Sequence, residues 1–338
     1  MTTSVLTALV ACVACSMTAC GPPAPPGDPA PPAWQLVASA TGPAARWGHV
    51  AVWDPRRSRM IVYGGSNWRR RFDDTWAFTL ATRSWERLDT GPGPTARYTA
   101  AAVIDAARDR MIVAGGDDGV PTADVWALDL ATLRWSRLPE GPDARFDAMA
   151  ATDGRRAWFF AGLRSLYFEE LDDLWELDLA TDRWSALPNQ GTRPPATSNS
   201  ALAYHRGALY TFGGHATLGP TPGAFRYDLA TQRWSQRSEQ GTAGAITHFA
   251  YAMDDACGVL WLTGGDASDY YDVATSDGLV LGDTVRVVPL PATQLPTPRR
   301  HAVLAFDPAT RTLVVFGGSR GLSSVLDDTW TYTPPRCP

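Results

Sequence analysis

One phrase written four times along the chain limits what this sequence can fold into. Its copies are TWAFTLATRSW at 75–85, VWALDLATLRW at 125–135, LWELDLATDRW at 174–184 and AFRYDLATQRW at 224–234. Each copy ends in a tryptophan, and successive tryptophans are about fifty residues apart. A converging active site has no reason to recur at a fixed period, whereas a stack of similar supersecondary units does. The repeated phrase therefore indicates the architecture of the chain, and its function has to be argued separately.

Each repeating unit carries four strand signals, which are clearest in the first unit. The signals are WGHVAVWD at 47–54, MIVYGG at 60–65, DDTWAFTL at 73–80 and WERL at 85–88. They are rich in β-branched and aromatic residues, and Gly, Pro, Asp and Ser separate them. This pattern predicts four short strands joined by turns in each unit.

A glycine pair follows the second strand signal of nearly every unit. The pairs stand at 64/65, 115/116, 213/214, 264/265 and 317/318, with Ala161-Gly162 as a degenerate copy. The chain therefore contains six units, of which the fifth is the most degenerate because residues 278–290 lack both tryptophans. Glycine suits a position where backbones crowd and a turn needs positive φ.

The order of these features resembles the kelch repeat. After the glycine pair comes an aromatic residue, at Trp76, Trp126, Trp175, Phe225 and Trp330, and then the closing tryptophan of the phrase. The likeness covers roughly residues 34–333. It implies an all-β, six-bladed β-propeller with four-stranded blades around a central channel. We expect the tryptophans to pack between neighbouring sheets rather than to form a carbohydrate platform.

The two ends of the repeat array predict how the ring closes. The last unit stops after its third strand signal, TWTYTP at 329–334, and lacks a fourth. An orphan signal, WQLV at 34–37, precedes the first unit and resembles WERL. We therefore expect an N-terminal strand at 34–38 to complete the last blade, which removes the free edges of an open ring.

The N-terminal segment predicts export. Residues 5–15 form an apolar run too short to span a bilayer, and MTACG at 17–21 resembles a bacterial lipobox, although the segment before it has no Lys or Arg. We expect a signal peptide at 1–20 with lipidation at Cys20, a Pro-rich linker at 21–33 and the propeller at 34–338. Gly21 favours an outer-membrane lipoprotein over one kept at the inner membrane. An unlipidated periplasmic protein and a misassigned start codon remain as alternatives.

Two cysteines, Cys257 and Cys337, lie outside the signal segment. The propeller topology places them on the same face of neighbouring blades. Because an exported protein meets an oxidising compartment, we expect a Cys257–Cys337 disulfide, with two unpaired thiols as the alternative.

Composition and motifs exclude several function classes. The formal net charge is −5 with a pI near 5.5. The chain therefore lacks the overall positive charge that is typical of proteins that bind nucleic acids. The histidines lack metal-ligand spacing with a third partner, and no nucleophile elbow or phosphate loop is present. We expect a monomer with no metal, no cofactor and no catalytic residues.

Four arginines are the candidate ligand-binding residues. Arg46, Arg97 and Arg299 precede their glycine pairs by eighteen residues, and Arg145 matches once its shorter turn is allowed for. Thr197 and Ile246 take this place in the fourth and fifth units. The kelch resemblance implies that such arginines can line the channel mouth and bind acidic or carboxylate groups through their planar fork. The alternative is a structural role, in which they pair with backbone carbonyls or with acids of nearby strands.

The function that follows is a binding or scaffold module at the bacterial envelope. Its partner would be a protein, a peptide or a glycan held at the face with the variable loops, and an acidic partner would suit the four arginines. A periplasmic mutarotase acting on sugar acids is one alternative, since it shares the blade number and needs carboxylate binders. A purely structural envelope protein is another. Copper-radical oxidases of the galactose oxidase type do not fit, because they need a cysteine joined to a tyrosine and two histidine ligands.

Overall fold

The structure is a computed structural model of the chain. It describes residues 33–38, 41–165, 167, 169–217, 219–241, 243–267, 271–290, 292 and 294–337. Residues 32–338 form one compact unit. The predicted signal segment with Cys20, and all of the predicted linker except its last residue, lie outside the described residues.

Three separate four-stranded antiparallel sheets form the first half of the described chain. The first sheet contains β2 (Val50–Asp54), β3 (Arg59–Tyr63), β4 (Thr75–Thr79) and β5 (Ser84–Leu88). The second contains β6 (Ala101–Asp105), β7 (Arg110–Ala114), β8 (Val125–Asp129) and β9 (Arg134–Leu138). The third contains β10 (Met149–Thr152), β11 (Arg156–Leu163), β12 (Glu170–Asp178) and β13 (Arg183–Leu187). Strands pair in chain order, so each sheet is a β-meander.

The next two antiparallel units join into one larger sheet. The fourth unit contains β15 (Ala201–His205), β16 (Ala208–Phe212), β19 (Ala224–Asp228) and β20 (Arg233–Gln240). The fifth contains β21 (Ala250–Asp254), β22 (Val259–Thr263), β23 (Ser276–Val280) and β24 (Thr284–Pro289). The join is parallel, with Ser238 of β20 opposite Thr284 of β24. A short strand, β14 (Gln190–Gly191), also pairs in parallel with β20. The repeat pattern did not predict these pairings; the join to β24 arises where β20 runs on past its own blade.

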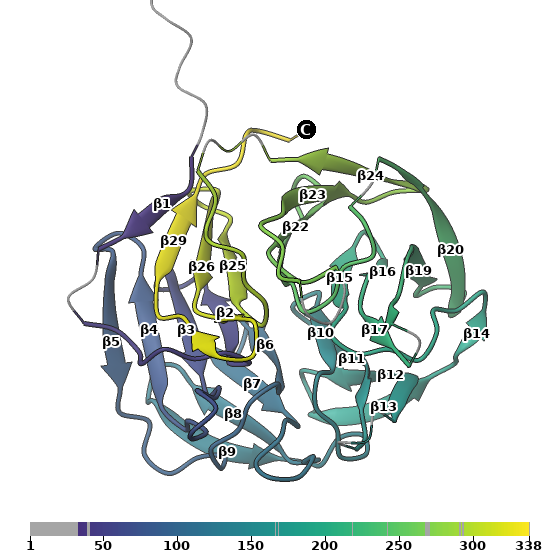
Figure 1. The fold of residues 1–338 in the computed structure, drawn as a ribbon. Coiled ribbons are helices and arrows are strands. Elements are labelled where there is room, and N and C mark those ends of the chain that lie inside the picture. Colours follow the sequence, from purple (N-terminus) through teal and green to yellow (C-terminus); the bar gives the residue numbers. More distant parts are fainter. Residues whose placement is uncertain are drawn as a thin grey trace, which may run out of the picture. The chain divides into compact units, whose positions relative to one another are not determined.

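The N-terminal strand completes the last blade, as the sequence predicted. The blade contains β25 (Val303–Asp307), β26 (Thr312–Phe316), β29 (Thr329–Tyr332) and β1 (Gln35–Val37). Gln35 lies opposite Thr331, and Figure 1 shows β1 beside β29. The Trp34 ring stacks on Tyr332 at 5.2 Å between centroids. The two ends of the propeller therefore share one sheet.

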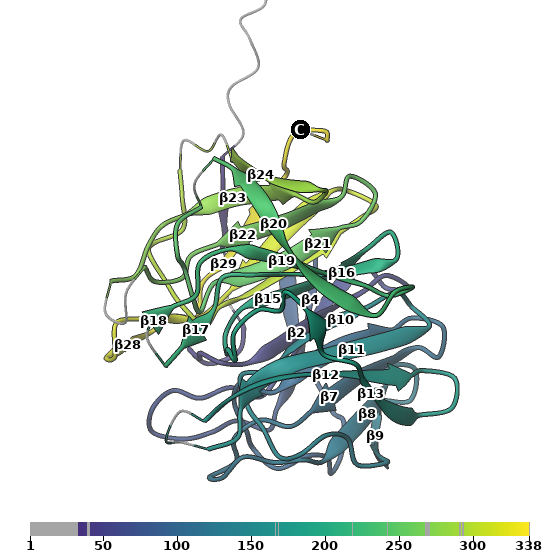
Figure 2. The ribbon, with the colours of Figure 1, turned by 90° about the vertical axis from the view of Figure 1, so that its right-hand side faces the viewer.

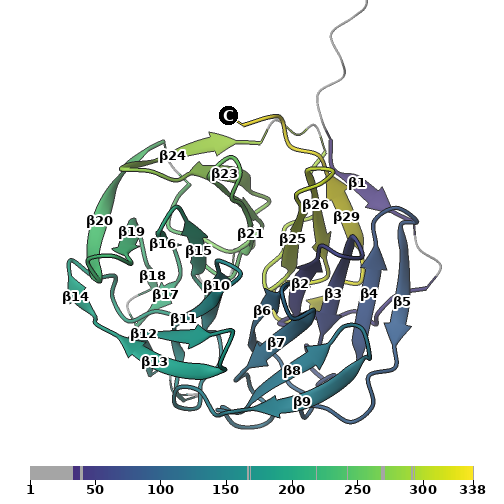
Figure 3. The ribbon, with the colours of Figure 1, turned by 180° about the vertical axis from the view of Figure 1, so that it is seen from behind.

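The six innermost strands close the ring. They are β2, β6, β10, β15, β21 and β25, each of which contacts the next, and β25 contacts β2 again. Figure 3 shows these strands around the centre, and the outer strands of each unit lie farther out, toward the rim. The chain is thus an all-β propeller built from six four-stranded units.

The glycine pairs lie where neighbouring blades meet. The amide of Gly65 donates to the carbonyl of Arg97 in the next blade at 2.8 Å. The last blade repeats this bond to the first, from Gly318 to Arg46 at 2.9 Å. Gly64 has a φ of 74°, and a Cβ there would lie 2.6 Å from the Arg97 carbonyl oxygen. The sequence argument for glycine at this position, crowding together with positive φ, therefore holds.

The tryptophans pack between blades. Trp53 and Trp85 of the first blade are buried in one apolar cluster with Val37 and Phe316 of the last blade. The Trp85 indole N–H also donates to the Thr329 hydroxyl at 3.0 Å. These side chains are therefore structural, as expected.

Two small hairpins lie on one face of the propeller, within the loops that follow the second strand of their blades. They are formed by β17 (His215–Ala216) with β18 (Gly219–Pro220) and by β27 (Ser319–Arg320) with β28 (Ser324–Val325). In Figure 2, β17, β18 and β28 project on the same side of the molecule. In the third blade, β11 runs on to Leu163 and β12 begins at Glu170, so both strands reach into the connection between them.

Cys257 and Cys337, the pair predicted from the sequence, form a disulfide with a Cα–Cα distance of 5.2 Å. It ties the turn between β21 and β22 to the segment after β29. Within the described residues, no helix is long and apolar enough to cross a membrane.

Candidate functional site

The four predicted arginines form buried ion pairs. The Arg97 guanidinium donates to both carboxylate oxygens of Asp124, at 2.6 and 2.9 Å, and to the Gly115 carbonyl at 2.9 Å. The Trp126 indole N–H donates to the same carboxylate at 2.6 Å. Burial alone would raise the pKa of Asp124, but the bonds from Arg97 and Trp126 outweigh it and hold that pKa below its usual value. We call this arrangement the Arg–Asp–Trp unit.

The Arg–Asp–Trp unit occurs in four of the six blades. The other three copies are Arg46–Asp74–Trp76, Arg145–Asp173–Trp175 and Arg299–Asp328–Trp330. In the fourth blade Thr197, Gly223 and Phe225 occupy the three places, and in the fifth Ile246, Thr275 and Asp277 do so. No member of the unit is kept where the arginine is absent. This joint loss is expected if the three side chains act as one structural element.

This geometry matches the structural alternative for the arginines, in which they pair with acids and backbone carbonyls. Arg46, Arg97, Arg145 and Arg299 are all at most 5% exposed, and none of them lines the central cavity. Their donor forks already hold carboxylates and carbonyls. The geometry therefore favours a structural role over the ligand-binding role, on which the acidic ligand and the mutarotase alternative depended.

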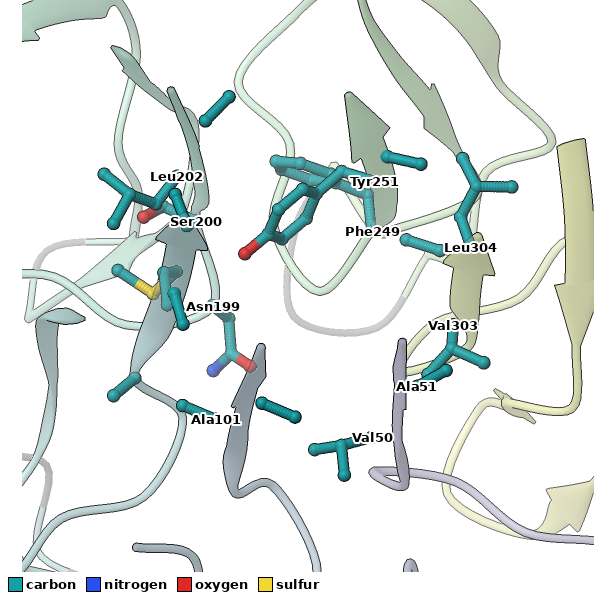
Figure 4. A pocket seen from close by; sticks show the side chains of 18 of the residues that line it. Val50, Ala51, Ala101, Asn199, Ser200, Leu202, Phe249, Tyr251, Val303 and Leu304 are labelled. Carbon is teal, nitrogen blue, oxygen red and sulfur yellow. The ribbon is translucent and has the colours of Figure 1, made fainter. Parts of the chain in front are cut away.

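The central channel itself contains a cavity of about 500 Å³. Its lining comes from the six innermost strands and the residues just before them. Figure 4 shows mainly apolar side chains facing it, among them Val50, Leu202, Phe249 and Val303. In the same view Asn199 and the Tyr251 hydroxyl point into the space. The cavity has the size and mixed lining of a small-ligand site.

A ring of six equivalent residues, which we call the mouth ring, surrounds one end of this cavity. Each of its members stands two residues after the arginine position of its blade, and the ring consists of Gly48, Thr99, Asp147, Asn199, His248 and His301. All six have φ between 49° and 62°. Each backbone N–H donates to the carbonyl of the preceding member: Thr99 to Gly48 (2.5 Å), Asp147 to Thr99 (2.8 Å), Asn199 to Asp147 (3.3 Å), His248 to Asn199 (3.3 Å), His301 to His248 (2.8 Å) and Gly48 to His301 (3.1 Å). The backbone of the ring is therefore regular, while its side chains differ around the mouth.

The mouth-ring side chains have unusual electrostatics. Burial raises the pKa of Asp147 to about 6, although His248 and Asn199 oppose the shift. Burial, with the nearby His248 and Arg300, holds the pKa of His301 well below its usual value, so its ring is neutral near pH 7. His248 in turn hydrogen-bonds to the Asp266 carboxylate at 2.9 Å. The ring thus combines a partly buried carboxyl, an amide and imidazoles.

Aromatic side chains lie beside the mouth ring. The Trp47 ring is 5.1 Å from His301 and 4.8 Å from Tyr98, between centroids. Trp68 stacks on Trp47 at 4.3 Å and is 45% exposed. Its φ of 69° is strained for a bulky residue, and such strain is typical of functional loops. Trp68 is thus an exposed aromatic side chain beside the mouth ring, and it lies over the buried Trp47.

Sequence reasoning missed the mouth ring. The signal was available, because the ring lies two residues after the arginine column that the repeats align. It was overlooked because six equivalent places carry five residue types, so the column does not look like a motif. No group of three or more His, Cys, Asp or Glu side chains suited to a metal ion occurs within the part of the chain that the structure describes.

Fold and site together define a six-bladed β-propeller. Its structural elements repeat from blade to blade, whereas the side chains at its channel mouth differ between blades. A family model for the KLHDC2/KLHL20/DRC7 Kelch-repeats domain matches residues 32–214 and 139–286. The chain belongs to the kelch-repeat family. This fold suggests a protein-interaction or scaffold module.

A comparison with curated proteins adds a short local likeness. The chain is 37% identical over 68 residues to the dynein alpha chain of the flagellar outer arm from Chlamydomonas reinhardtii. The match covers 19% of this chain and 1% of that protein.

Proposed function

We propose that this kelch propeller is a binding module that holds a partner protein at the face with the mouth ring. The observation that carries the proposal is the contrast between scaffold and mouth. The Arg–Asp–Trp unit recurs in four blades, whereas the mouth ring and the loops beside it differ from blade to blade. A rigid scaffold with varied loops at one end is how binding sites are commonly built.

The test compares partner capture by full-length variants. Trp68→Ala removes an exposed aromatic ring beside the mouth. Arg83→Ala removes an exposed side chain in the turn between β4 and β5 and is the matched control. We expect at least one protein to be captured by the wild type and by Arg83→Ala but not by Trp68→Ala. Equal capture by all three would contradict the proposed face.

We further propose that the chain is exported and anchored by a lipid at Cys20 in a bacterial envelope, and that its partner is an envelope protein or glycan. The apolar run at 5–15 and the lipobox-like residues 17–21 support this proposal. A disulfide within the propeller is consistent with an oxidising compartment. Metabolic labelling with a fatty-acid analogue should mark the wild type and spare Cys20→Ser. Label retained in Cys20→Ser would contradict anchoring at this residue.

A further inference from the structure

We infer that the channel mouth binds a protonated amine on an unbranched aliphatic stem, with the Asp147 carboxylate as its counter-ion. The inference rests on the proposed binding function and names the chemistry of the ligand. It combines the charge of the cavity lining, the aromatic rings beside the mouth and the shape of the channel.

The lining of the cavity carries carboxylates and no arginine. The chain contains no lysine, so arginine and histidine supply its cationic side chains. Of the three lining carboxylates, Asp153 pairs with Arg156 at 3.0 Å and Asp255 with His205 at 2.7 Å. The third is Asp147, for which the described residues provide no ion pair. A cationic ligand group would supply the partner that Asp147 lacks.

The surroundings of Asp147 do not neutralise it. The charges of His248 and Asp117 act on its carboxyl in opposite directions, with His248 lowering its pKa and Asp117 raising it. An unpaired carboxylate in a desolvated place costs free energy, which its raised pKa of about 6 reflects. An apolar or amide side chain here would avoid that cost. The placement is explained if an incoming cation offsets it.

Aromatic side chains beside the mouth ring suit the same ligand. The Trp47 ring lies 5.1 Å from the ring of His301, a mouth-ring residue, and 4.8 Å from the Tyr98 ring, between centroids. Trp68, which stacks on Trp47, is 45% exposed. Aromatic faces attract ammonium groups, most strongly where water is displaced. An incoming amine would therefore meet an aromatic face beside the mouth ring.

The interior of the channel suits an aliphatic stem. Beyond the mouth ring, the innermost strands present Val50, Leu202 and Val303 together with many alanines. The cavity of about 500 Å³ has a mixed polar and apolar lining, and these apolar side chains can contact the methylene groups of a flexible chain. A lysine side chain of the partner protein and a small free amine share this chemistry.

Calorimetric titration of the full-length protein tests the inference. The probes are diaminopentane and N-acetyl-lysine amide, with N-acetyl-norleucine amide and glutarate as the uncharged and anionic comparisons. We expect the two amines to bind and both comparison compounds to bind at least about tenfold more weakly, because neither comparison compound offers a cation to pair with the carboxylate. Equal binding of the lysine and norleucine compounds would overturn the role of the charge.

Asp147→Asn should weaken amine binding at least about tenfold. The matched control is Asp143→Asn, which removes the same charge from an exposed side chain that pairs with the exposed Arg164. Thermal unfolding of the same samples shows whether each variant is folded. Binding retained in a folded Asp147→Asn variant, or lost equally in Asp143→Asn, would overturn the inference.

The two sources of the amine are separated by partner capture. If the source is a lysine of the partner, diaminopentane competes with the captured protein; if it is a free amine, the diamine binds and capture is unaffected. Both outcomes support the amine site. Capture by the wild type together with no amine binding overturns this inference and leaves the proposed function standing, whereas failure of the capture test itself concerns the proposed function.

Discussion

The amide of Gly48 donates to the carbonyl of His301 at 3.1 Å, and this bond joins the first blade to the last. The two residues are 253 positions apart in the chain, yet they occupy equivalent places in their blades. The bond completes a circle of six such bonds around the channel. Closure therefore fixes the backbone of the mouth ring, and the side chains of the ring are free to differ.

Removing Trp34 should destabilise the whole propeller. Its side chain is 1% exposed and packs in one cluster with Val315 and Tyr332 of the last blade. We expect Trp34→Ala to lower the free energy of unfolding by about 3–5 kcal/mol, because it leaves a large cavity. Leu36→Ala is the control, since Leu36 is 56% exposed in the same strand. Chemical unfolding measures both, and an equal, small effect would contradict closure by β1.

Breaking one Arg–Asp–Trp unit should affect stability. Arg97→Ala leaves the partly buried Asp124 carboxylate without its partner, and we expect a loss of about 3 kcal/mol. Arg137→Ala, which breaks the exposed pair with Glu140, should cost less than about 1 kcal/mol. Urea unfolding compares the two variants. If Arg97→Ala kept full stability and lost only partner binding, the arginines would be ligand-binding residues after all.

Asp147→Asn should stabilise the free protein near neutral pH. Because the pKa of Asp147 is raised to about 6, the folded state binds its proton more tightly than the unfolded state does. The benefit of that proton is complete below about pH 4 and is lost as the pH rises through 6. We expect the variant to exceed the wild type by about 1–3 kcal/mol near pH 7 and by little near pH 4.

Unfolding curves at both pH values, with Asp143→Asn as a charge-matched control, test this. Differences between variants cancel the titration of the other groups that face the site, including His248 and Asp117. A gain in stability that did not depend on pH would show that Asp147 is not a strained carboxylate. Stability gained together with binding lost would be typical of a functional site.

The disulfide should contribute measurably to stability. Cys257 and Cys337 are 80 residues apart, so the cross-link restricts the unfolded chain substantially. Replacing both residues with alanine should lower the free energy of unfolding by about 2–4 kcal/mol. Under reducing conditions the wild type should approach the variant. If oxidised wild type and variant unfold alike, the bond does not form in solution.

The scaffold was predictable because its physical requirements recur. Gly64 must avoid the Arg97 carbonyl, and Trp85 must fill the space between two blades. The same requirements return in later blades, so the sequence repeats them and a single chain reveals the period. The orphan strand signal at 34–37 was equally informative, since β1 completes the sheet of the last blade.

The site was less predictable because its residues do not recur. Asp147 and His248 occupy equivalent backbone places with different side chains, so no repeat points to them. For Arg97 the repeat suggested a ligand-binding role, because a charged residue that recurs near a channel is typical of a ligand site. Its carboxylate partner, Asp124, lies 27 residues further on, and only the three-dimensional structure shows that they meet. The parallel join of β20 and β24 was hidden for a similar reason, because it occurs once.

Closure of the ring by β1 is the central claim, and a cysteine cross-link tests it most directly. Gln35 and Thr331 lie opposite each other, so Gln35→Cys with Thr331→Cys should form a disulfide within one chain. Leu36→Cys with Thr331→Cys shifts the register by one residue and turns the two side chains to opposite faces, so it should not. Peptide mapping of the oxidised monomer reads out both variants. We predict the 35–331 link alone; its absence, or a link found only between two chains, would contradict the closed six-bladed ring.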